Sequence, residues 1–477
     1  MPSGPEEKEL NLSAAEITQA LQGLLLCGNP QSRAVGVCSD SRRVQGGELF
    51  VPLQGGRFNG HDFIQEALAQ GVAGSLLQRG EEGRAKEWHF PGKFLIRVDD
   101  VLESLGDLAH FWRRRQPARI VAITGSNGKT TTKEMTAHIL SEKFKVLRTE
   151  GNLNNLIGLP LMLLRLSPEH EVAVLEMGMN QKGEIRRLRA VAEPQVSLIT
   201  NIGRAHLEFL GTLEEVARAK GELWENLAGE DWIGVNLDDP QVCKLAAGAR
   251  CRKKTYGISP AADVRAESIG LDCGKGIRFT LAVGGRKRSV GLRAFGRHQV
   301  SNALAAACIS AILGVEMDGI VTGLETFRPI PGRGQILFLG RNISVFDDSY
   351  NANPDSLRAT VSAFSALKGE RRGILVLGDM LELGSASAEA HQKAGKEVGE
   401  KGFAHLFLMG DYTAHLAEGA REAGMREERI HRFRADPEMV PGLMEILEDG
   451  DWILIKGSRR MGMEKILQGL IHRLGKT

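Results

Sequence analysis

Short runs of apolar residues recur along the chain, and most of them end at a glycine or a polar side chain. Buried strands of parallel sheets have this pattern, because helices cover both of their faces. Amphipathic stretches lie between the runs, so strands and helices alternate, which predicts an α/β fold. The clearest strand candidates are Ile120–Ile123, Glu171–Leu175, Val196–Ile202, Trp232–Asn236, Ile343–Phe346, Gly373–Leu377, Ala404–Met409 and Trp452–Ile455.

Local signals mark the starts of two predicted helices. Ser13 and Glu16 have the spacing of a capping box at the start of a helix from Leu10 to Leu21. A second helix is expected from Thr212 to Leu227, with Thr212 as its N-cap. Between Lys253 and Leu292, apolar runs alternate with glycine-rich turns, which predicts a β-meander.

Proline-containing stretches suggest where domains meet. A chain of 477 residues is too long for one hydrophobic core, so two to three domains are expected. Pro117 ends an amphipathic connecting segment from Asp100 to Arg113, and Pro329-Ile-Pro331 precedes the last series of strands and helices. These two positions are the expected domain boundaries.

Composition and charge are those of an ordinary globular enzyme. Apolar residues make up 42% of the chain, charged residues 25%, and the net charge of +2 points to no nucleic-acid or membrane partner. Six cysteines without a C-x-x-C pair make a disulfide framework or a structural zinc site improbable. The start of the chain lacks the basic and apolar regions of a signal peptide. We therefore expect a cytoplasmic enzyme with reduced thiols and no membrane insertion.

The strongest chemical signal is the stretch Thr124-Gly-Ser-Asn-Gly-Lys-Thr130 between a predicted strand and a predicted helix starting at Lys133. Glycines and a helix N-terminus in this order form a phosphate-binding loop, in which Lys129 would reach the β- and γ-phosphates of ATP and Thr130 would ligate Mg²⁺. The match to G-x-x-x-x-G-K-[ST] is incomplete, since Ile123 occupies the position of the first glycine.

Polar side chains follow several of the predicted strands. Glu176 ends one strand of the central block and could hold the metal of an ATP site. His206 follows the next strand, and this position favours a metal site over the commoner surface or core histidine. Lys220 lies inside a predicted helix, where a lysine is normally solvated. In open parallel sheets, ligands bind beyond the carboxyl ends of the strands. The last four strand candidates end in Asp347-Asp348, Gly378-Asp379, Gly410-Asp411 and Lys456-Gly-Ser458, which fits that rule.

Two further polar stretches have two interpretations each. Asn152, Asn154 and Asn155 lie in one loop, where turn chemistry and substrate contact are equally good explanations. Ser39-Asp-Ser-Arg42 ends a short strand and forms either a capped turn with a local ion pair or a clamp for a sugar nucleotide.

Taken together, these motifs resemble those of the Mur ligase family, and the similarity covers nearly the whole chain. The phosphate loop looks like the variant loop of that family, which also lacks the first glycine. The other matching motifs follow in family order and are Glu176-Met-Gly178, Asn201-Ile-Gly-Arg-Ala-His206, Gly296-Arg-His298 with Asn302, Pro331-Gly-Arg333, and Asp347-Asp-Ser-Tyr-Asn-Ala-Asn-Pro354.

Within the family, three stretches favour the branch that adds D-Ala-D-Ala to UDP-N-acetylmuramoyl-tripeptide. These are Gly151-Asn-Leu-Asn-Asn155, Ser349-Tyr-Asn-Ala-Asn-Pro354 and Leu377-Gly-Asp-Met-Leu-Glu-Leu-Gly384. The Asp-Asn-Pro-Arg motif of the ligases that add the third amino acid is absent. About a hundred residues precede the phosphate loop, whereas folylpolyglutamate synthases start almost at theirs, so folate is not the expected substrate.

The resemblance implies a fold of three α/β domains. A small N-terminal domain with a connecting helix (residues 1–117) would bind the uridine nucleotide. A central domain with a parallel sheet like that of P-loop ATPases (residues 118–331) would bind ATP. A C-terminal Rossmann-like domain (residues 332–477) would complete the ligase. The family also implies an acyl-phosphate intermediate, ATP and Mg²⁺ as cofactors, and a carbamate formed from CO₂ on Lys220.

The resemblance further implies a set of site residues. Residues with catalytic roles would be Lys129, Glu176, His206, Lys220 and Arg333. ATP would contact Gly125, Ser126, Asn127, Gly128, Lys129, Thr130, Thr131, Asn302, Arg333 and Asp348. Mg²⁺ would be held by Thr130, Glu176, His206 and Lys220. The two other substrates would contact Ser39, Asp40, Ser41, Arg42, Asn152, Asn154, Asn155, Asn351 and Asn353.

Two alternatives remain beside this reading. A sister Mur ligase would add a single amino acid instead of the dipeptide. A scaffold protein with a degenerate ligase fold would have lost metal or lysine positions, yet Thr130, Glu176, His206 and Lys220 are all present. We expect a monomer whose partners are its small-molecule substrates.

Overall fold

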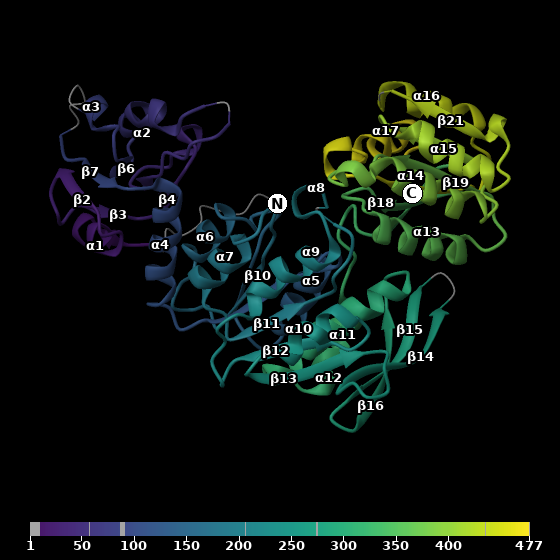
Figure 1. Cartoon of the computed structure of the whole chain (residues 1–477), viewed down its shortest axis with the longest axis horizontal. Coiled ribbons are helices and arrows are strands. Elements are labelled where there is room, and N and C mark those ends of the chain that lie inside the picture. Colours follow the sequence, from purple (N-terminus) through teal and green to yellow (C-terminus); the bar gives the residue numbers. More distant parts are fainter. Residues whose placement is uncertain are drawn as a thin grey trace. The chain divides into compact units, whose positions relative to one another are not determined.

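The computed structural model describes residues 10–56, 58–85, 91–205, 207–272, 275–434 and 436–476. Figure 1 labels the helices and strands along the chain. The structure contains two compact units. The first comprises Met1–Ile123, Lys143–Met179 and Gly183–Ser197, and the second comprises Thr124–Glu142, Asn180–Lys182 and Leu198–Thr477. Every helix among the described residues is too short or too polar to span a bilayer.

The N-terminal region forms a five-stranded sheet with strand order β2-β7-β6-β5-β4. Its strands are parallel except β2, which runs antiparallel to β7. Ser13 and Glu16 form the predicted capping box of α1. The strands are β2 (Leu24–Cys27), β4 (Val37–Cys38), β5 (Leu49–Phe50), β6 (Gly74–Gln78) and β7 (Phe94–Val98), and the main helices are α1 (Ala14–Ala20), α2 (Ile64–Ala69) and α4 (Val101–Arg113).

The central sheet has nine strands in the order β16-β15-β14-β13-β12-β11-β8-β10-β9. Its strands are β8 (Arg119–Thr124), β9 (Val146–Arg148), β10 (Val172–Glu176), β11 (Val196–Ile199), β12 (Trp232–Asn236), β13 (Arg252–Gly257), β14 (Val264–Asp272), β15 (Gly276–Val283) and β16 (Arg286–Leu292). Buried apolar side chains fill β8 from Ile120 to Ile123 and β10 from Val172 to Leu175, as expected for strands covered on both faces.

The predicted β-meander from Lys253 to Leu292 is wrong at its first strand. β14, β15 and β16 are antiparallel neighbours, but β13 pairs parallel with both β12 and β14. The loop after β13 folds back beside that strand: Asp263, just before β14, accepts hydrogen bonds from Thr255 N (2.8 Å) and Thr255 Oγ1 (2.7 Å) of β13. The chain therefore re-enters the sheet in the same direction instead of turning back as a hairpin.

The helices of the central region are α5 (Lys129–Ser141), α6 (Gly158–Leu163), α7 (Glu184–Ala192), α8 (Leu207–Leu210), α9 (Leu213–Gly221), α10 (Pro240–Ala247), α11 (Arg297–Ile312) and α12 (Met317–Thr326). Helix α5 starts four residues earlier than predicted, because Gly128 takes a left-handed conformation (φ 80°) from which the helix continues at once. Helix α9 keeps Thr212 as its N-cap but ends at Gly221, where a 3₁₀ turn (Glu222–Trp224) replaces the predicted continuation to Leu227.

The C-terminal region forms a six-stranded sheet with order β17-β18-β22-β19-β20-β21, parallel except for β17. Figure 1 draws this region in green to yellow. All four strands predicted here are present, as β18 (Ile343–Asp348), β19 (Gly373–Gly378), β20 (His405–Met409) and β22 (Trp452–Lys456). The edge strands β17 (Gln335–Leu339) and β21 (Ile430–Phe433) were not predicted. The helices are α13 (Pro354–Lys368), α14 (Ser387–Gly399), α15 (Thr413–Glu422), α16 (Asp436–Ile446) and α17 (Glu464–Leu474).

Alternate side chains of this sheet enter two separate cores. Phe346 and Leu375 pack with residues of α13, α14 and α15, such as Phe364. Val345 and Val376 pack on the other face with residues of α16 and α17. With both faces covered, the carboxyl ends of β18, β19 and β22 are left as the edge where polar groups gather.

Candidate active site

The phosphate loop after β8 has two points where only glycine fits. Gly125 has φ 146° and Gly128 φ 80°, both outside the range that other residues favour. A Cβ atom on Gly125 would lie 1.9 Å from Thr200 Oγ1, and one on Gly128 would lie 2.2 Å from Asn302 Oδ1. These contacts fix the course of the loop.

Backbone groups of the loop are held by the segment that follows β11. Ser126 N donates to Asn201 O (2.9 Å), and Asn127 N donates to Asn201 Oδ1 (2.9 Å). Gly203 N donates to Ser126 Oγ (2.8 Å). Lys129 Nζ donates to the carbonyl oxygen of Gly125 at 2.8 Å, so its ammonium lies over the loop. The loop is thus shaped by residues more than seventy positions away in the sequence.

Asn302, predicted to contact the nucleotide, lies against the start of α5. It is buried, its Oδ1 accepts from Thr132 Oγ1 (3.4 Å), and its Nδ2 donates to Gln299 Oε1 (3.1 Å). Thr131, which precedes Thr132 in the chain, is also buried. The structure therefore brings Asn302 to the phosphate loop, while its contact with adenine stays a prediction.

Arg333 also reaches the phosphate loop. Its Nη2 lies 3.3 Å from Thr130 Oγ1, to which it donates, and its guanidinium carbon lies 4.0 Å from the centroid of the Tyr350 ring. The turn before it is tied to β18, because Gly332 N donates to Asp347 Oδ2 (2.8 Å). Burial raises the pKa of Asp347, although hydrogen bonds from Ser349 and Gly332 oppose this.

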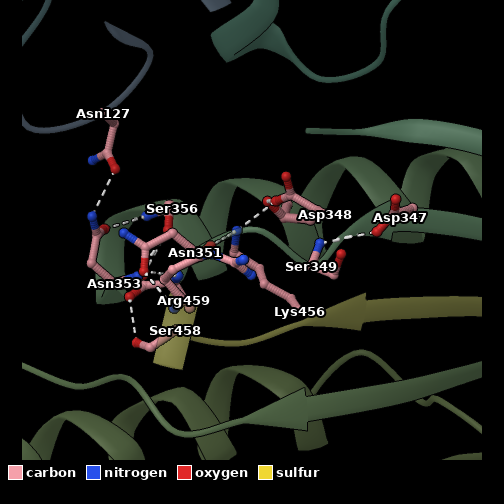
Figure 2. A network of polar contacts seen from close by, with 12 residues as sticks. Asn127, Asp347, Asp348, Ser349, Asn351, Asn353, Ser356, Lys456, Ser458 and Arg459 are labelled. Carbon is pink, nitrogen blue, oxygen red and sulfur yellow. Dashed lines mark hydrogen bonds and ion pairs between the residues drawn. The ribbon is translucent and has the colours of Figure 1, made fainter. Parts of the chain in front are cut away.

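A second connection runs between asparagines of the phosphate loop and of the loop after β18. Asn353 Nδ2 donates to Asn127 Oδ1 at 2.7 Å (Figure 2), and Asn353 Oδ1 caps α13 by accepting from Ser356 N at 2.9 Å. Asp355 Oδ2 accepts from Arg204 N at 3.0 Å, next to Gly203. The predicted residues Asn127 and Asn353 are therefore brought together.

Asp348 belongs to a buried ion pair with a residue that was not among the predicted site residues. Lys456, at the end of β22, lies with its Nζ 2.5 Å from Asp348 Oδ2 and donates to Asn351 O at 2.9 Å (Figure 2). Thr360 Oγ1 also donates to Asp348 Oδ2, at 2.6 Å. The only signal for Lys456 in the sequence is its place at the end of an apolar run.

Ser458 joins the loops that follow three strands of the C-terminal sheet. Its N donates to Asp379 O (3.0 Å), its Oγ donates to Ala352 O (3.2 Å), and that Oγ accepts from Leu381 N (2.8 Å). Asn351 Oδ1 in turn accepts from Arg459 N at 3.2 Å (Figure 2). These bonds make one polar layer along the carboxyl edge of the sheet.

Glu176 is buried in the first unit, where Asn154 is its neighbour. Glu176 Oε1 accepts from Asn154 Nδ2 at 2.8 Å, and Glu176 Oε2 is buried without a hydrogen-bond partner among the described residues. Asn155 serves the turn instead, since its Oδ1 accepts from Gly158 N (2.8 Å) at the start of α6. Asn152 is exposed. Of the two interpretations of this loop, Asn155 shows turn chemistry and Asn154 lies beside a predicted metal ligand.

The segment Ser39-Asp-Ser-Arg42 forms a capped turn with a local ion pair. Asp40 accepts from Arg42 N (3.1 Å), and Arg42 Nη2 lies 2.8 Å from Asp40 Oδ2. The hydrogen bond from Arg42 lowers the pKa of Asp40 to about 2. Ser41 is buried and Ser39 half-buried. Contact with a sugar nucleotide stays a prediction.

Lys220 is almost fully buried on α9, with 1% of its surface exposed, so it is not the solvated lysine that a helix normally carries. Burial, and secondarily the positive charge of Lys129, lower the pKa of Lys220 well below its usual range.

His206, predicted as a metal ligand, lies outside the described residues. Among the residues that are described, no three His, Cys, Asp or Glu side chains form a metal-binding group.

Comparison with known proteins places these features in a family. Models of the Mur ligase family match three segments of the chain: the catalytic domain at residues 33–113, the middle domain at 123–310 and the glutamate ligase domain at 332–459. The UDP-N-acetylmuramoyl-tripeptide--D-alanyl-D-alanine ligase of Bacillus subtilis is 34% identical over 96% of this chain and 97% of its own. This chain belongs to the Mur ligase family.

Other Mur ligases are also similar to this chain over nearly its whole length. The enzyme of the same name from Escherichia coli is 36% identical over 97% of this chain and 98% of its own. A crystal structure of MurF from Acinetobacter baumannii matches with a TM-score of 0.88 and 30% identity, covering 98% of this chain and 100% of that one. MurF of Thermotoga maritima, solved in complex with ADP, matches with a TM-score of 0.79, 27% identity and coverage of 91% and 96%. The predicted family and its fold of three α/β domains are confirmed.

The Lys456–Asp348 ion pair should contribute measurably to stability. Replacing Lys456 with Met leaves the largely buried Asp348 carboxylate without its cation, so the free energy of unfolding in urea should fall by about 3 kcal/mol. Adding Asp348→Asn to the same chain should recover part of the loss. The exposed Lys401→Met is the control and should change little. Equal stabilities of Lys456→Met and Lys401→Met would contradict the prediction.

The loop after β19 depends on a neutral histidine. His391 is buried, its Nδ1 lies 2.7 Å from Ser387 O, and its Nε2 accepts from Met380 N at 2.9 Å. Burial lowers the pKa of His391, although the Ser387 carbonyl and Asp379, 3.8 Å away, oppose this. Protonation of Nε2 would break its bond with Met380.

Stability should therefore fall on acidification. The unfolded chain takes up a proton at His391 near pH 6.5, before the folded chain does, so the free energy of unfolding should decline as the pH falls below about 6.5. His391→Gln should flatten this decline, whereas the exposed His472→Gln should not. Urea unfolding of the three proteins from pH 8 to 5.5 provides the measurement, and parallel profiles would refute the role of His391.

Proposed function

We propose that this chain is an ATP-dependent ligase that joins D-Ala-D-Ala to UDP-N-acetylmuramoyl-tripeptide in the synthesis of peptidoglycan precursors. Full-length relatives with that activity in their names support the choice of substrates. The observation that carries the chemistry is the contact of Arg333 with Thr130, which adds a cation from the C-terminal region to the phosphate loop.

The reaction has two steps. The terminal carboxylate of the tripeptide attacks the γ-phosphorus of ATP, which gives an acyl phosphate and releases ADP. The amine of D-Ala-D-Ala then attacks the acyl carbon, loses a proton and expels inorganic phosphate. In the first step two anions approach each other, so catalysis depends on fixed cations and positioning. Lys129 and Arg333 provide those charges.

ATP binds the loop from Gly125 to Thr131, with Asn302 and Asp348 as further contacts. Mg²⁺ would be held by Thr130, Glu176, His206 and Lys220, where it would neutralise charge on the transferred phosphoryl group. The buried Glu176 Oε2 supports this, because it has no hydrogen-bond partner in the described part of the chain and an uncompensated carboxylate oxygen is costly unless a cation occupies its vicinity. Hydroxyl and carboxylate oxygens are also the donors that Mg²⁺ prefers.

Lys220 would become able to hold the metal by reacting with CO₂. A protonated lysine would repel a cation, whereas its neutral amine adds to the carbon of CO₂ and releases a proton, leaving a carbamate with a negative charge. The lowered pKa of Lys220 supports this step, since the neutral amine is the reactive form.

Each of the other two substrates is assigned to a region of the chain. The uridine nucleotide contacts Ser39, Asp40, Ser41 and Arg42 in the domain of residues 1–117, and the tripeptide side contacts Asn152, Asn154 and Asn155. The C-terminal domain of residues 332–477 receives D-Ala-D-Ala near Asn351 and Asn353, and the central domain of residues 118–331 binds ATP. We infer a cytoplasmic monomer that acts without nucleic acid or membrane insertion.

Removing the ammonium of the phosphate loop tests the proposal. Lys129→Ala should lower phosphate release with ATP, the UDP-tripeptide and D-Ala-D-Ala at least about 100-fold, because one fixed charge at the developing phosphoryl anion is lost. Lys143→Ala, an exposed lysine just beyond the same helix, is the matched control. Thermal melting should show that both variants fold. Normal ligation by Lys129→Ala would refute the assignment, and wild-type turnover with single amino acids instead of the dipeptide would favour a sister ligase.

The carbamate is tested by controlling CO₂. Enzyme depleted of CO₂ at neutral pH should lose activity and regain it when bicarbonate is added, whereas Lys220→Ala should stay inactive with or without bicarbonate. Isotope-edited NMR with ¹³C-bicarbonate should show a carbamate signal in the wild type that is missing from Lys220→Ala. Unchanged activity after depletion, together with no such signal, would rule the modification out.

A further inference from the structure

Two arginines contact the ring of one tyrosine at the carboxyl edge of the C-terminal sheet. The guanidinium carbon of Arg333 lies 4.0 Å from the centroid of Tyr350, and that of Arg459 lies 5.4 Å from the same centroid. Arg333 also donates to Thr130 of the phosphate loop. The tyrosine therefore links an arginine at the phosphate loop with a second arginine that the reaction described above does not use.

Arg459 is held in place but remains accessible. Its backbone N donates to Asn351 Oδ1 at 3.2 Å (Figure 2), and its Nη1 donates to Glu464 Oε1 at 2.7 Å. Its side chain is still 56% exposed. A guanidinium has five N–H donors, so the bond to Glu464 fixes its orientation and leaves donors for a second acceptor.

The incoming dipeptide carries a charge that the reaction must leave alone. Its amine attacks the acyl carbon, while its carboxylate stays free and needs a cation at the far end of the molecule. An extended dipeptide is about 7 Å long, at roughly 3.5 Å per residue. The guanidinium carbons of Arg333 and Arg459 lie 4.0 and 5.4 Å from the Tyr350 centroid, so both arginines lie within the reach of one dipeptide placed along that ring.

We propose that Arg459 binds the carboxylate of D-Ala-D-Ala and so determines specificity for an acceptor with a free carboxyl terminus. The dipeptide lies along Tyr350, with its amine toward Arg333 and Thr130 and its carboxylate at Arg459. Glu464 orients the guanidinium, and Asn351 holds the backbone of Arg459. This subsite rests on the proposed function, since it needs a dipeptide as the acceptor.

The test compares D-Ala-D-Ala with D-alanyl-D-alaninamide, which lacks the carboxylate, in a phosphate-release assay. The wild type should use the amide about 100-fold less efficiently, as expected for a charge-assisted hydrogen bond. Arg459→Met should lower kcat/KM for D-Ala-D-Ala about 10- to 100-fold, mainly through KM, and change kcat/KM for the amide less than about threefold. KM for ATP should stay the same, and Arg459→Lys should restore part of the loss.

Arg460→Met is the matched control, because Arg460 is the adjacent exposed arginine with the same charge. It should behave as the wild type on both acceptors, and melting temperatures should confirm that both variants fold. Equal losses of Arg459→Met on both acceptors, or no loss on either, would overturn the subsite. A wild type that ligates D-Ala-D-Ala without rejecting the amide would overturn it too, whereas a wild type that does not ligate D-Ala-D-Ala would overturn the proposed function itself.

Discussion

The lack of space around two glycines of the phosphate loop governs the arrangement of the site. Gly125 lies against Thr200, and Gly128 lies against Asn302, so neither position has room for a Cβ atom. Thr200 follows β11 and Asn302 belongs to α11, so elements distant in sequence hold the loop in one conformation. A loop fixed in this way needs little reorganisation to meet phosphate oxygens, which is the basis of electrostatic preorganisation.

The carboxyl edge of the C-terminal sheet forms the other side of this arrangement. Ser458 and Lys456 tie together the loops after β18, β19 and β22 through the backbone of Ala352, Asp379 and Asn351. The same edge presents Asn353 to the phosphate loop. A parallel sheet produces such an edge because all its strands end on one side. The site therefore depends on strand order as much as on any single side chain.

The sequence predicted those features that depend on local pattern. The capping box of Ser13 and the four buried C-terminal strands were found because caps and continuous apolar runs are local signals. Strand β17 was missed although Ile336–Leu339 is a continuous apolar run, because so short a run does not by itself distinguish an edge strand, on which Phe338 is exposed, from a loop. The parallel pairing of β13 was missed because hydrophobic pattern does not specify strand direction.

At the site, too, motifs in the sequence identified single residues, whereas contacts between residues far apart in the sequence were not predicted. Resemblance to a family could name Lys129, Arg333 and Asp348, but not the partners that hold them. Lys456 is 108 residues from Asp348, and Arg333 is 203 residues from Thr130, so only the folded chain shows these contacts. The burial of Lys220 was likewise hidden, since the residue lies on a helix whose pattern looks amphipathic.

The abundance of asparagine around the phosphate loop follows from electrostatics. A site that joins a carboxylate to a phosphate benefits when some of its backbone turns are held by acceptors that do not repel anions, beside carboxylates such as Asp347 and Asp355. Amide oxygens meet that need, because they accept hydrogen bonds at full strength without a net charge. Asn201 accepts from Asn127 N, Asn127 accepts from Asn353, and Asn351 accepts from Arg459 N. An aspartate in place of Asn201 would lose the bond from Nδ2 to Asn127 O (3.0 Å), and its negative charge would weaken the attraction for ATP.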